Sequence, residues 1–321
     1  MKIVFLDRNT IGDDIDISIL ERFGELKVYP FTEELDVESR ISGFDVIVTN
    51  KSKLNSNTLR NSKIQLICIT ATGTDNIDLN YCNEKGIPVC NVTGYSTESV
   101  VQHTFAMLLS LKEHIPLYHQ YTKSKGFVND TSFRHLAWSF HEICNKNYGI
   151  IGMGTIGRRV AEVATAFGCK VYYWSSKNQD RSDLYTRVDL DNLLEKCDII
   201  SIHSPLTPET FHLFGKEQFK KMKSDAILIN VGRGDIIIEE DLADAIENNL
   251  IGGAAIDVLS KEPMSQESPF LRILDDLRFL VTPHIAWAAV EARQRCMQEI
   301  CLNIEFFNKG ERRNRVDTIK I

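Results

Sequence analysis

Three side chains of types that bind anions or carry protons follow short apolar runs in the second half of the chain. Arg233 stands between two glycines after the run AILINV, and its planar guanidinium suits a carboxylate held by two hydrogen bonds. His284 ends the run FLVTPH and could exchange a proton near neutral pH. Glu262 precedes a proline, which keeps it off any helix, and a carboxylate beside His284 would favour the imidazolium and fix its ring. A surface ion pair for Arg233, a structural histidine and a solvated glutamate are the ordinary alternatives.

A glycine-rich loop in residues 148–157, YGIIGMGTIG, has the spacing of a dinucleotide-binding turn. Gly152 would make the tight turn, Gly154 would let a pyrophosphate approach the backbone, and Gly157 would let a helix pack on the strand. An apolar run precedes the loop, an amphipathic helical pattern follows it, and a second strand is predicted at 171–174. The N–H groups at the start of that helix suit phosphate. The alternative is a glycine-rich turn without a ligand, which any α/β protein can contain.

The residue after this second strand is not the acid that usually binds the adenosine ribose of NAD. Ser175, Ser176 and Lys177 stand there instead, so no carboxylate repels the 2′-phosphate of NADP. Two hydroxyls and an ammonium could bind that phosphate, although most loop lysines are simply solvated. The sequence therefore leaves NAD and NADP both open as the cofactor, with a slight preference for NADP.

Short apolar runs alternate with helical patterns along the chain, which predicts an α/β fold with parallel sheets. Continuous apolar runs such as AILINV are typical of strands that are covered on both faces. Ligands bind at the carboxyl ends of such strands, where the side chains described above would lie. The predicted strands are Lys2–Leu6, Asp45–Thr49, Gln65–Ile69, Pro88–Val92, Tyr148–Ile151, Val171–Trp174, Ile199–His203, Ala226–Val231, Ala254–Val258 and Phe279–Thr282.

Two longer helical patterns, at about 98–121 and 288–307, interrupt this alternation and bracket the glycine-rich loop. This arrangement predicts one domain inserted into another. Residues 97–288 would form a dinucleotide-binding domain, and residues 1–96 with 289–321 would form a substrate-binding, catalytic domain. Active sites are common between domains, because closure of the domains excludes water.

The composition is that of an ordinary globular protein, since the 321 residues are 43% hydrophobic and 25% charged, with a net charge of −7. No Lys/Arg run stands out, so we expect no nucleic-acid partner. No apolar stretch reaches the ~18 residues that a membrane span needs, and the N-terminus is typical of a first strand rather than a signal peptide. The eight cysteines form no C-x-x-C pair, which favours buried, reduced thiols in the cytoplasm and no metal site.

Taken together, the sequence resembles the D-isomer-specific 2-hydroxyacid dehydrogenase family across nearly the whole chain, most closely its glycerate dehydrogenase/hydroxypyruvate reductase branch. The resemblance implies two Rossmann/flavodoxin-like domains, the cofactor domain inserted into the substrate domain, in a homodimer. Ser175, where many members carry Asp, departs from the pattern and puts NAD preference in doubt rather than the reaction. The matching stretches are ATGTDNIDL (71–79), GIPVCNVTGYSTESVVQHTFAMLL (86–109), GIIGMGTIGRRVAEVATAFG (149–168), ILINVGRGDII (227–237), GGAAIDVLSKEP (252–263) and VTPHIAWAAVEARQR (281–295).

The resemblance also implies roles for single residues. Arg233 would bind the substrate carboxylate, His284 would be the acid/base, and Glu262 would assist it. Further substrate contacts are implied for Lys51, for the backbone N–H groups near Thr72 and Gly73, and for Trp287. Further cofactor contacts are implied for Thr104, Thr155, Ile156, Ser204, Val231 and Asp257.

The implied reaction passes a hydride between NAD(P)H and a small 2-oxo acid or D-2-hydroxy acid. Hydroxypyruvate/D-glycerate and glyoxylate/glycolate are the favoured substrate pairs. Pyruvate is a further candidate, because the sequence does not give the shape of the substrate pocket. One alternative is an NAD(H)-sensing, corepressor-like scaffold without turnover, against which the intact set of Arg233, Glu262 and His284 argues. The other is a different oxidoreductase on the same scaffold, such as one that uses formate, whose histidine partner would be an amide where this chain has Glu262.

Overall fold

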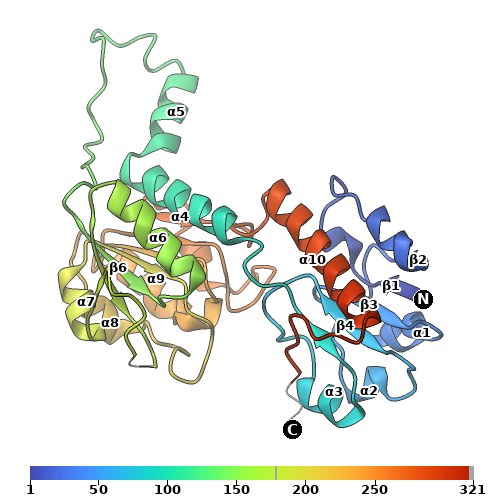
Figure 1. The fold of residues 1–321 in the computed structure, drawn as a ribbon. Helices are drawn as coiled ribbons and strands as arrows, with labels where there is room; N and C mark the ends of the chain where they lie inside the picture. The colour runs from blue at the N-terminus through green and yellow to red at the C-terminus, as the bar shows by residue number, and fades with distance from the viewer. Residues whose placement is uncertain (178, 318–321) are drawn as a thin grey trace. The chain divides into compact units, whose positions relative to one another are not determined.

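The computed structural model describes residues 1–177 and 179–317, and the chain divides into two compact units. One unit contains Met1–Ser96 and the chain from Ala288 onward, and the other contains Thr97–Trp287 (Figure 1). Both are built on a parallel β-sheet, which confirms the predicted α/β class. No helix within the described residues is long and apolar enough to cross a membrane.

The elements of the first unit are, in chain order, β1 (Lys2–Phe5), β2 (Glu25–Val28), α1 (Val37–Ile41), β3 (Val46–Thr49), α2 (Ser56–Leu59), β4 (Leu66–Ile69), α3 (Leu79–Lys85), β5 (Val89–Cys90) and α10 (Val290–Asn308). The strand order is β2-β1-β3-β4-β5. Every residue of β3 and β4 is buried, as expected for strands covered on both faces. The sequence missed β2, because at this sheet edge its residues alternate between exposed and half-buried.

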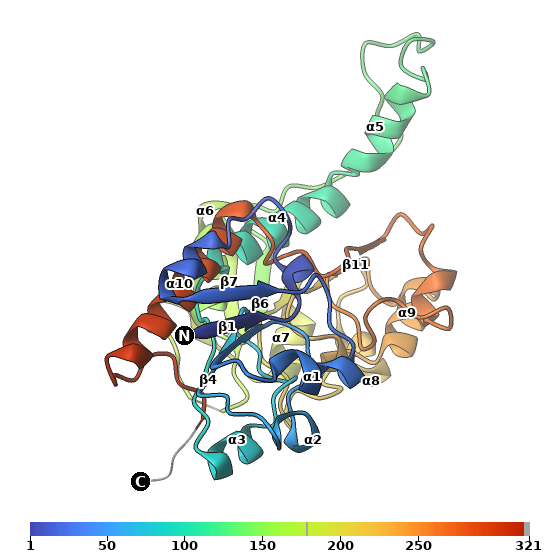
Figure 2. The same ribbon diagram turned by 90° about the vertical axis from the view of Figure 1, so that its right-hand side faces the viewer.

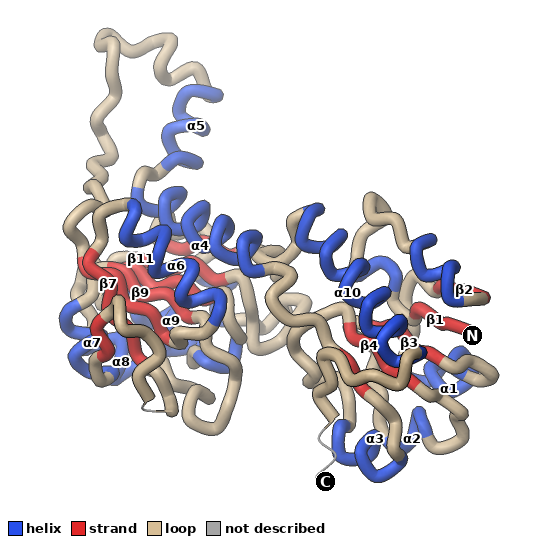
Figure 3. The backbone as a smooth tube through the Cα atoms, in the orientation of Figure 1, coloured by secondary structure: helices blue, strands red, loops and turns tan. Residues whose placement is uncertain are grey.

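The elements of the second unit are α4 (Thr97–Lys112), α5 (Ile115–Lys123), β6 (Asn147–Ile151), α6 (Thr155–Ala166), β7 (Lys170–Trp174), β8 (Thr186–Arg187), α7 (Leu190–Lys196), β9 (Ile199–Ile202), α8 (Lys216–Lys221), β10 (Ile227–Asn230), α9 (Glu239–Glu247), β11 (Gly253–Ile256) and β12 (Phe279–Val281). The strand order is β12-β11-β10-β9-β6-β7-β8, and helices flank the sheet (Figure 3). The chain runs from β6 toward β8 on one side and from β9 toward β12 on the other. The carboxyl ends of β6 and β9 are therefore the switch point where such sheets bind ligands.

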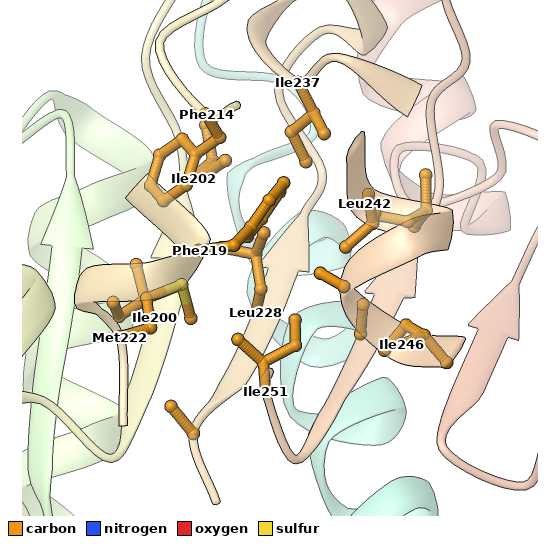
Figure 4. Packing of buried hydrophobic residues seen from close by; sticks show 14 of the residues in the cluster. Ile200, Ile202, Phe214, Phe219, Met222, Leu228, Ile237, Leu242, Ile246 and Ile251 are labelled. Carbon is orange, nitrogen blue, oxygen red and sulfur yellow. The ribbon is translucent and has the colours of Figure 1, made fainter. Parts of the chain in front are cut away.

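Apolar packing around β9 and β10 fixes the loops that carry the candidate site. Ile202 and Leu228, from these two strands, lie in one cluster with Phe214, Phe219 and Leu242 (Figure 4). All five side chains are fully buried, and burying each one contributes roughly 1.5–3 kcal/mol. This packing holds the carboxyl ends of the neighbouring strands in a constant relative position.

The single helix predicted at 98–121 is wrong, because the chain breaks it into α4 and α5. His114, between them, has a left-handed backbone with a φ of 54°, and Pro116 lies in the first turn of α5. Proline lacks an N–H donor and its ring clashes with the preceding turn, so one helix ends and another begins. Residues 113–142, which we call the arm, contain α5 and a loop that extend away from the sheet of this unit (Figures 1 and 2). The pattern predicted at 288–307 is confirmed as α10.

Candidate active site

His284 and Glu262 form a hydrogen-bonded pair at the carboxyl edge of the second sheet. His284 follows β12 and Glu262 follows the neighbouring strand β11. His284 Nδ1 lies 2.8 Å from Glu262 Oε2, and each side chain is 30% exposed. Glu262 is itself held in place, because its Oε1 accepts a hydrogen bond from the backbone N–H of Leu259. A carboxylate at Nδ1 orients the ring and leaves Nε2 to face a substrate.

Asp257 holds the loop that carries His284. Its carboxylate is 1% exposed and accepts hydrogen bonds from Thr282 Oγ1 at 2.6 Å and from the backbone N–H groups of residues 285–286 at 2.9 Å. Burial alone would raise the pKa of Asp257, but the bonds from His103, Thr282 and the backbone outweigh burial and lower the pKa. Asp257 is therefore charged at neutral pH and positions the loop, a role that the sequence did not predict.

The backbone of His284 is itself unusual, with a φ of 56° in the left-handed region. Such a conformation persists only where the surroundings impose it. The N–H of His284 donates to Thr282 O at 3.0 Å, and Trp287 Nε1 donates to His284 O at 3.0 Å. From α4, Ser99 Oγ donates to Ala286 O at 2.6 Å. Trp287 thus holds the loop of His284, and its implied contact with substrate stays a prediction.

Arg233 follows β10 in a loop that packs against the loop after β11. A Cβ at Gly234 would lie 2.0 Å from the carbonyl carbon of Leu259, so only glycine allows this approach. Asn230 stabilises the loop, because its Nδ2 donates to Arg233 O and its Oδ1 accepts from the N–H of Gly232. Arg233 is half-buried, and its Nη1 donates to Gly232 O at 2.9 Å. A cation therefore lies at the same sheet edge as the histidine–glutamate pair.

The glycine-rich loop after β6 has the backbone geometry that a dinucleotide needs. Gly152 has a φ of 98°, and a Cβ there would lie 2.7 Å from Ser204 N. A Cβ at Gly157 would lie 2.2 Å from Gly152 O, so this glycine lets α6 pack on the strand. Gly154 is the N-cap residue of α6, and a Cβ there would meet no atom of the described chain within 4 Å. The first turn of this helix therefore offers its N–H groups to a phosphate that can approach the backbone closely.

The polar groups around this loop fit a nicotinamide dinucleotide. Ser204 follows β9 and is buried, and its Oγ has no hydrogen-bond partner among residues 1–177 and 179–317. A buried hydroxyl without a partner costs free energy, which a ligand bound to Ser204 would offset. Thr155 and Ile156 form the first turn of α6, and Val231 follows β10 at the same edge of the sheet. These positions agree with the implied contacts, which stay predictions.

On α4, two neighbouring residues have different surroundings. His103 Nε2 lies 3.1 Å from Thr282 Oγ1 and 3.5 Å from Asp257 Oδ1, so this histidine belongs to the network that holds the loop after β12. The sequence did not assign His103 to the site, since a histidine on a helix is most often structural. Thr104 is fully buried, and its Oγ1 donates to Val100 O at 2.7 Å. The cofactor contact implied for Thr104 rests on the resemblance alone.

Ser175, Ser176 and Lys177 follow β7 directly. Ser175 lines a cavity of about 240 Å³ together with Arg187, the last residue of β8. Lys177 is exposed and Ser176 is half-buried. The sequence did not single out Arg187, because β8 has only two residues and no apolar pattern that marks it.

Lys51, Thr72 and Gly73 lie in the first unit, in the loops after β3 and β4. Asp7, which is buried, accepts hydrogen bonds from the backbone N–H groups of residues 50–52, including that of Lys51 at 2.8 Å. Thr72 Oγ1 donates to a backbone carbonyl after β5 at 2.8 Å. Because β3 and β4 are parallel neighbours, the two loops leave the sheet at the same edge. The sequence analysis did not predict this role of Asp7. The position of an acid just after the first strand was the only sequence feature that pointed to it.

Known proteins similar to this chain identify its family. The family model described as "D-isomer specific 2-hydroxyacid dehydrogenase, NAD binding domain" matches residues 105–286. The chain is 37% identical over 324 residues to a hydroxypyruvate reductase of Blautia hydrogenotrophica, covering 99% of this chain and 100% of that one. It is 33% identical over 318 residues to a glycerate dehydrogenase of Methylorubrum extorquens, covering 98% and 99% of the two chains. These relatives are named for enzymatic activities, which supports turnover rather than the sensing scaffold.

Solved structures agree with this assignment. A D-lactate dehydrogenase from Aquifex aeolicus, complexed with NAD and lactic acid, has a TM-score of 0.85 and 28% identity, covering 98% of this chain and 99% of that one. An acyclic imino acid reductase, in complex with NADPH and D-Arg, has a TM-score of 0.86 and 28% identity, covering 98% and 100%. The chain therefore belongs to the D-isomer-specific 2-hydroxyacid dehydrogenase family and is an oxidoreductase that uses a nicotinamide cofactor.

Proposed function

We propose that this enzyme reduces a small 2-oxo acid to the D-2-hydroxy acid, with hydroxypyruvate and glyoxylate as its favoured substrates. The observation that carries the proposal is the 2.8 Å pairing of His284 with Glu262, at the same sheet edge as Arg233. Nearly full-length similarity to a hydroxypyruvate reductase and a glycerate dehydrogenase supports hydroxypyruvate as the first substrate to test.

Each residue of this group has one task in the proposed reaction. When bound, the cofactor supplies the hydride that reaches C2 of the oxo acid. His284 donates a proton to the carbonyl oxygen. The donating atom is Nε2, because Nδ1 is bound to Glu262. Arg233 binds the substrate carboxylate and so fixes the orientation of the carbonyl. One hydride and one proton convert the 2-oxo acid to the 2-hydroxy acid, and in the reverse direction Nε2 accepts the proton of the hydroxyl.

We further propose that Lys51 and the backbone N–H groups of Thr72 and Gly73 take part in binding the substrate carboxylate. Their position after two parallel strands supports this role, since ligands bind at carboxyl ends. Asp7 supports it too, because its buried carboxylate fixes the backbone of Lys51. For Trp287 we propose a contact with the substrate through the indole ring, whose N–H already bonds His284 O.

We propose that the enzyme uses NADPH at least as readily as NADH. Ser175 supports this proposal, because an acid at that position would accept bonds from the ribose hydroxyls of NAD and repel the 2′-phosphate of NADP. The remaining cofactor contacts of this proposal are those of the glycine-rich loop and of Ser204.

A substrate panel tests the reaction. The purified enzyme is mixed with NADPH or NADH and with hydroxypyruvate, glyoxylate or pyruvate, and the nicotinamide absorbance band is followed. Hydroxypyruvate or glyoxylate should give a kcat of roughly 1–10³ s⁻¹. Tight cofactor binding without turnover of any oxo acid would favour the sensing scaffold, and oxidation of formate would favour the other alternative.

We propose that the enzyme is a homodimer in which a second copy of the chain covers the arm. Three apolar side chains of the arm are largely exposed, with Val128 at 77%, Phe133 at 82% and Leu136 at 70%. All three belong to the loop of the arm, and exposed apolar side chains that lie close together mark contacts between proteins. Analytical ultracentrifugation should therefore find a dimer of 36.5 kDa chains, and the double variant Phe133→Asp/Leu136→Asp should sediment as a monomer. A monomeric parent would contradict this proposal.

We also propose a cytoplasmic location. All eight cysteines are unpaired, and all except Cys144 are buried, which suits a reducing compartment. Enzyme purified without reductant should show one reactive thiol when folded and eight in denaturant. Fewer than eight thiols in denaturant would reveal a disulfide and argue against this location.

A further inference from the structure

A cavity of about 240 Å³ opens at the carboxyl ends of β7 and β8. The two strands are parallel neighbours, with Arg187 opposite Tyr173, so the chain leaves both at the same edge of the sheet. The volume is several times the ~30 Å³ that one water molecule occupies in the liquid, so a phosphate group has room there. The lining residues are Trp174, Ser175, Arg187, Val188 and Asp189.

The cavity lies where the adenosine end of a dinucleotide binds. β6 and β7 are parallel neighbours joined by the glycine-rich loop and α6. Ser175 therefore holds the position that an acid usually occupies beside the ribose hydroxyls. The 2′-phosphate of NADP extends from one of those hydroxyls, so residues that share the cavity with Ser175 are candidates to contact it.

Arg187 is the cation among the lining residues. Its Nε lies 3.0 Å from Asp180 Oδ1, and its side chain is 30% exposed, against 76% for Asp180. An ion pair with so exposed a partner contributes at most about 1 kcal/mol, so a doubly charged phosphate can compete with it. The planar guanidinium, with five N–H donors in a fixed fork, suits phosphate as well as carboxylate.

Asp189 is the acid of the cavity, and it has a structural task. Its Oδ1 accepts from the backbone N–H of Asn192 at 2.9 Å and its Oδ2 accepts from Asn192 Nδ2 at 2.6 Å, which caps α7. These two bonds lower the pKa of Asp189, so its carboxylate is charged and repels an anion placed beside it. A phosphate in this cavity would therefore lie on the side of Ser175 and Arg187.

Lys177, which the sequence favoured as a ligand of this phosphate, is exposed, so salt would screen its charge. The pKa of Glu209, in the loop after β9, is lowered mainly by a hydrogen bond from Thr207, and the charge of Lys177 adds only a minor contribution. The less exposed Arg187 is the stronger candidate.

We propose that Arg187, together with Ser175, binds the 2′-phosphate of NADPH and makes the enzyme prefer NADPH to NADH. This inference rests on the proposed function only in that a nicotinamide dinucleotide occupies the glycine-rich loop. It deepens the cofactor preference by naming the residue that determines it.

Calorimetric titration with 2′,5′-ADP and with AMP, which differ only by the 2′-phosphate, tests the inference without turnover. The parent should bind 2′,5′-ADP at least about tenfold more tightly than AMP, a difference of ~1.4 kcal/mol. Arg187→Ala should remove this difference while the affinity for AMP stays within about threefold of the parent. Arg187→Lys, which keeps the charge without the fork, should retain part of the difference and guards against misfolding of the alanine variant.

Asp180→Asn is the matched control, because it breaks the same ion pair and keeps the guanidinium. A phosphate ligand at Arg187 predicts that Asp180→Asn still prefers 2′,5′-ADP. If Arg187 only tethers the loop, Asp180→Asn and Arg187→Ala should change binding alike, and the inference is overturned. Ser175→Asp should shift the ratio of kcat/KM values toward NADH by at least about tenfold.

The experiments distinguish a failure of the proposed reaction from a failure of the role proposed for Arg187. A parent that discriminates 2′,5′-ADP from AMP but reduces no oxo acid would contradict the proposed function and leave the role of Arg187 intact. A parent that reduces oxo acids but binds 2′,5′-ADP and AMP equally would contradict the role of Arg187 alone.

Discussion

Glu262 Oε2 lies 2.8 Å from His284 Nδ1, although 22 residues separate the two along the chain. They meet because β11 and β12 are parallel neighbours, so the chain leaves both strands at one edge of the sheet. The contact decides which ring nitrogen can exchange a proton with a substrate. With Nδ1 held by the carboxylate, that nitrogen is Nε2.

Glu262→Gln keeps the size of the side chain and removes the charge beside His284. The amide can no longer offer a charged acceptor at both of its terminal atoms, so it holds Nδ1 of His284 and the N–H of Leu259 less firmly than the carboxylate does. We therefore expect kcat for reduction to fall while the Kd of NADPH stays close to that of the parent. Glu267→Gln, at an exposed glutamate in the following loop, is the control and should leave kcat unchanged. If Glu262→Gln has the kcat of the parent, Glu262 is not the partner of His284 in catalysis.

Asp257→Asn tests whether the buried carboxylate positions His284. The two oxygens of Asp257 accept from the N–H groups of residues 285 and 286 separately, so the amide places a donor against one of these donors. Losing a bond to a buried charged group costs about 1.5–3 kcal/mol. We expect a lower Tm and a lower kcat for reduction. A kcat and Tm equal to those of the parent would show that the loop does not depend on Asp257.

The same variant has a predicted pH dependence of stability. The folded-state pKa of Asp257 is lowered, so its contribution is present above the unfolded pKa of about 3.9 and is lost as the pH falls through the folded value. The difference in Tm between parent and Asp257→Asn should thus be largest near neutral pH and shrink below about pH 4. Thermal scans across this range measure it. A difference in Tm that stays constant with pH would show that folding does not lower the pKa of Asp257.

Gly157→Ala should lower stability, whereas Gly154→Ala should weaken cofactor binding and leave stability unchanged. At Gly157 the new Cβ would lie 2.2 Å from Gly152 O, and such overpacking typically costs about 1–3 kcal/mol. At Gly154 the new Cβ would meet no described atom within 4 Å, so the Tm should hold while the methyl group obstructs the pyrophosphate and weakens NADPH binding. Unchanged NADPH affinity in Gly154→Ala would place the pyrophosphate elsewhere.

Arg233→Ala should raise KM for the oxo acid and lower kcat/KM by several orders of magnitude. Truncating one member of a buried charge pair costs about 2–5 kcal/mol, and each ~1.4 kcal/mol is tenfold. Arg233→Lys keeps the charge but loses the forked N–H donors of the guanidinium, so its kcat/KM should lie between those of the parent and Arg233→Ala. Direct titration should show that NADPH affinity changes much less. Turnover close to that of the parent in Arg233→Ala would remove this residue from the mechanism.

The parts of the site that lie on strongly apolar strands could be predicted from the sequence. β10 and β11 are buried at every residue, so each reads as a continuous apolar run that ends just before Arg233 or Asp257. The parallel arrangement then brings the following loops to one edge without any knowledge of side-chain contacts. This is why the sequence alone could predict that Arg233, Glu262 and His284 each follow a strand, although not that these strands are neighbours.

Other features depend on contacts that no short pattern reports. Asp257 bonds backbone groups 28 and 29 residues further along the chain, and its position after a strand is equally consistent with a cofactor contact. β8 is two residues long, so the cavity that contains Arg187 has no sequence signature. The break between α4 and α5 at His114 could have been predicted from the sequence, because Pro116 marks the start of a new helix.

The most direct test of the proposed mechanism compares the parent with His284→Ala in the reduction of hydroxypyruvate by NADPH. His284 is the proton donor, so kcat in the alanine variant should fall by roughly 10²–10⁴. The Kd of NADPH, measured by fluorescence titration, should stay close to that of the parent, because no cofactor contact is assigned to the imidazole. A His284→Ala enzyme that turns over hydroxypyruvate and glyoxylate at nearly the rate of the parent would contradict the mechanism.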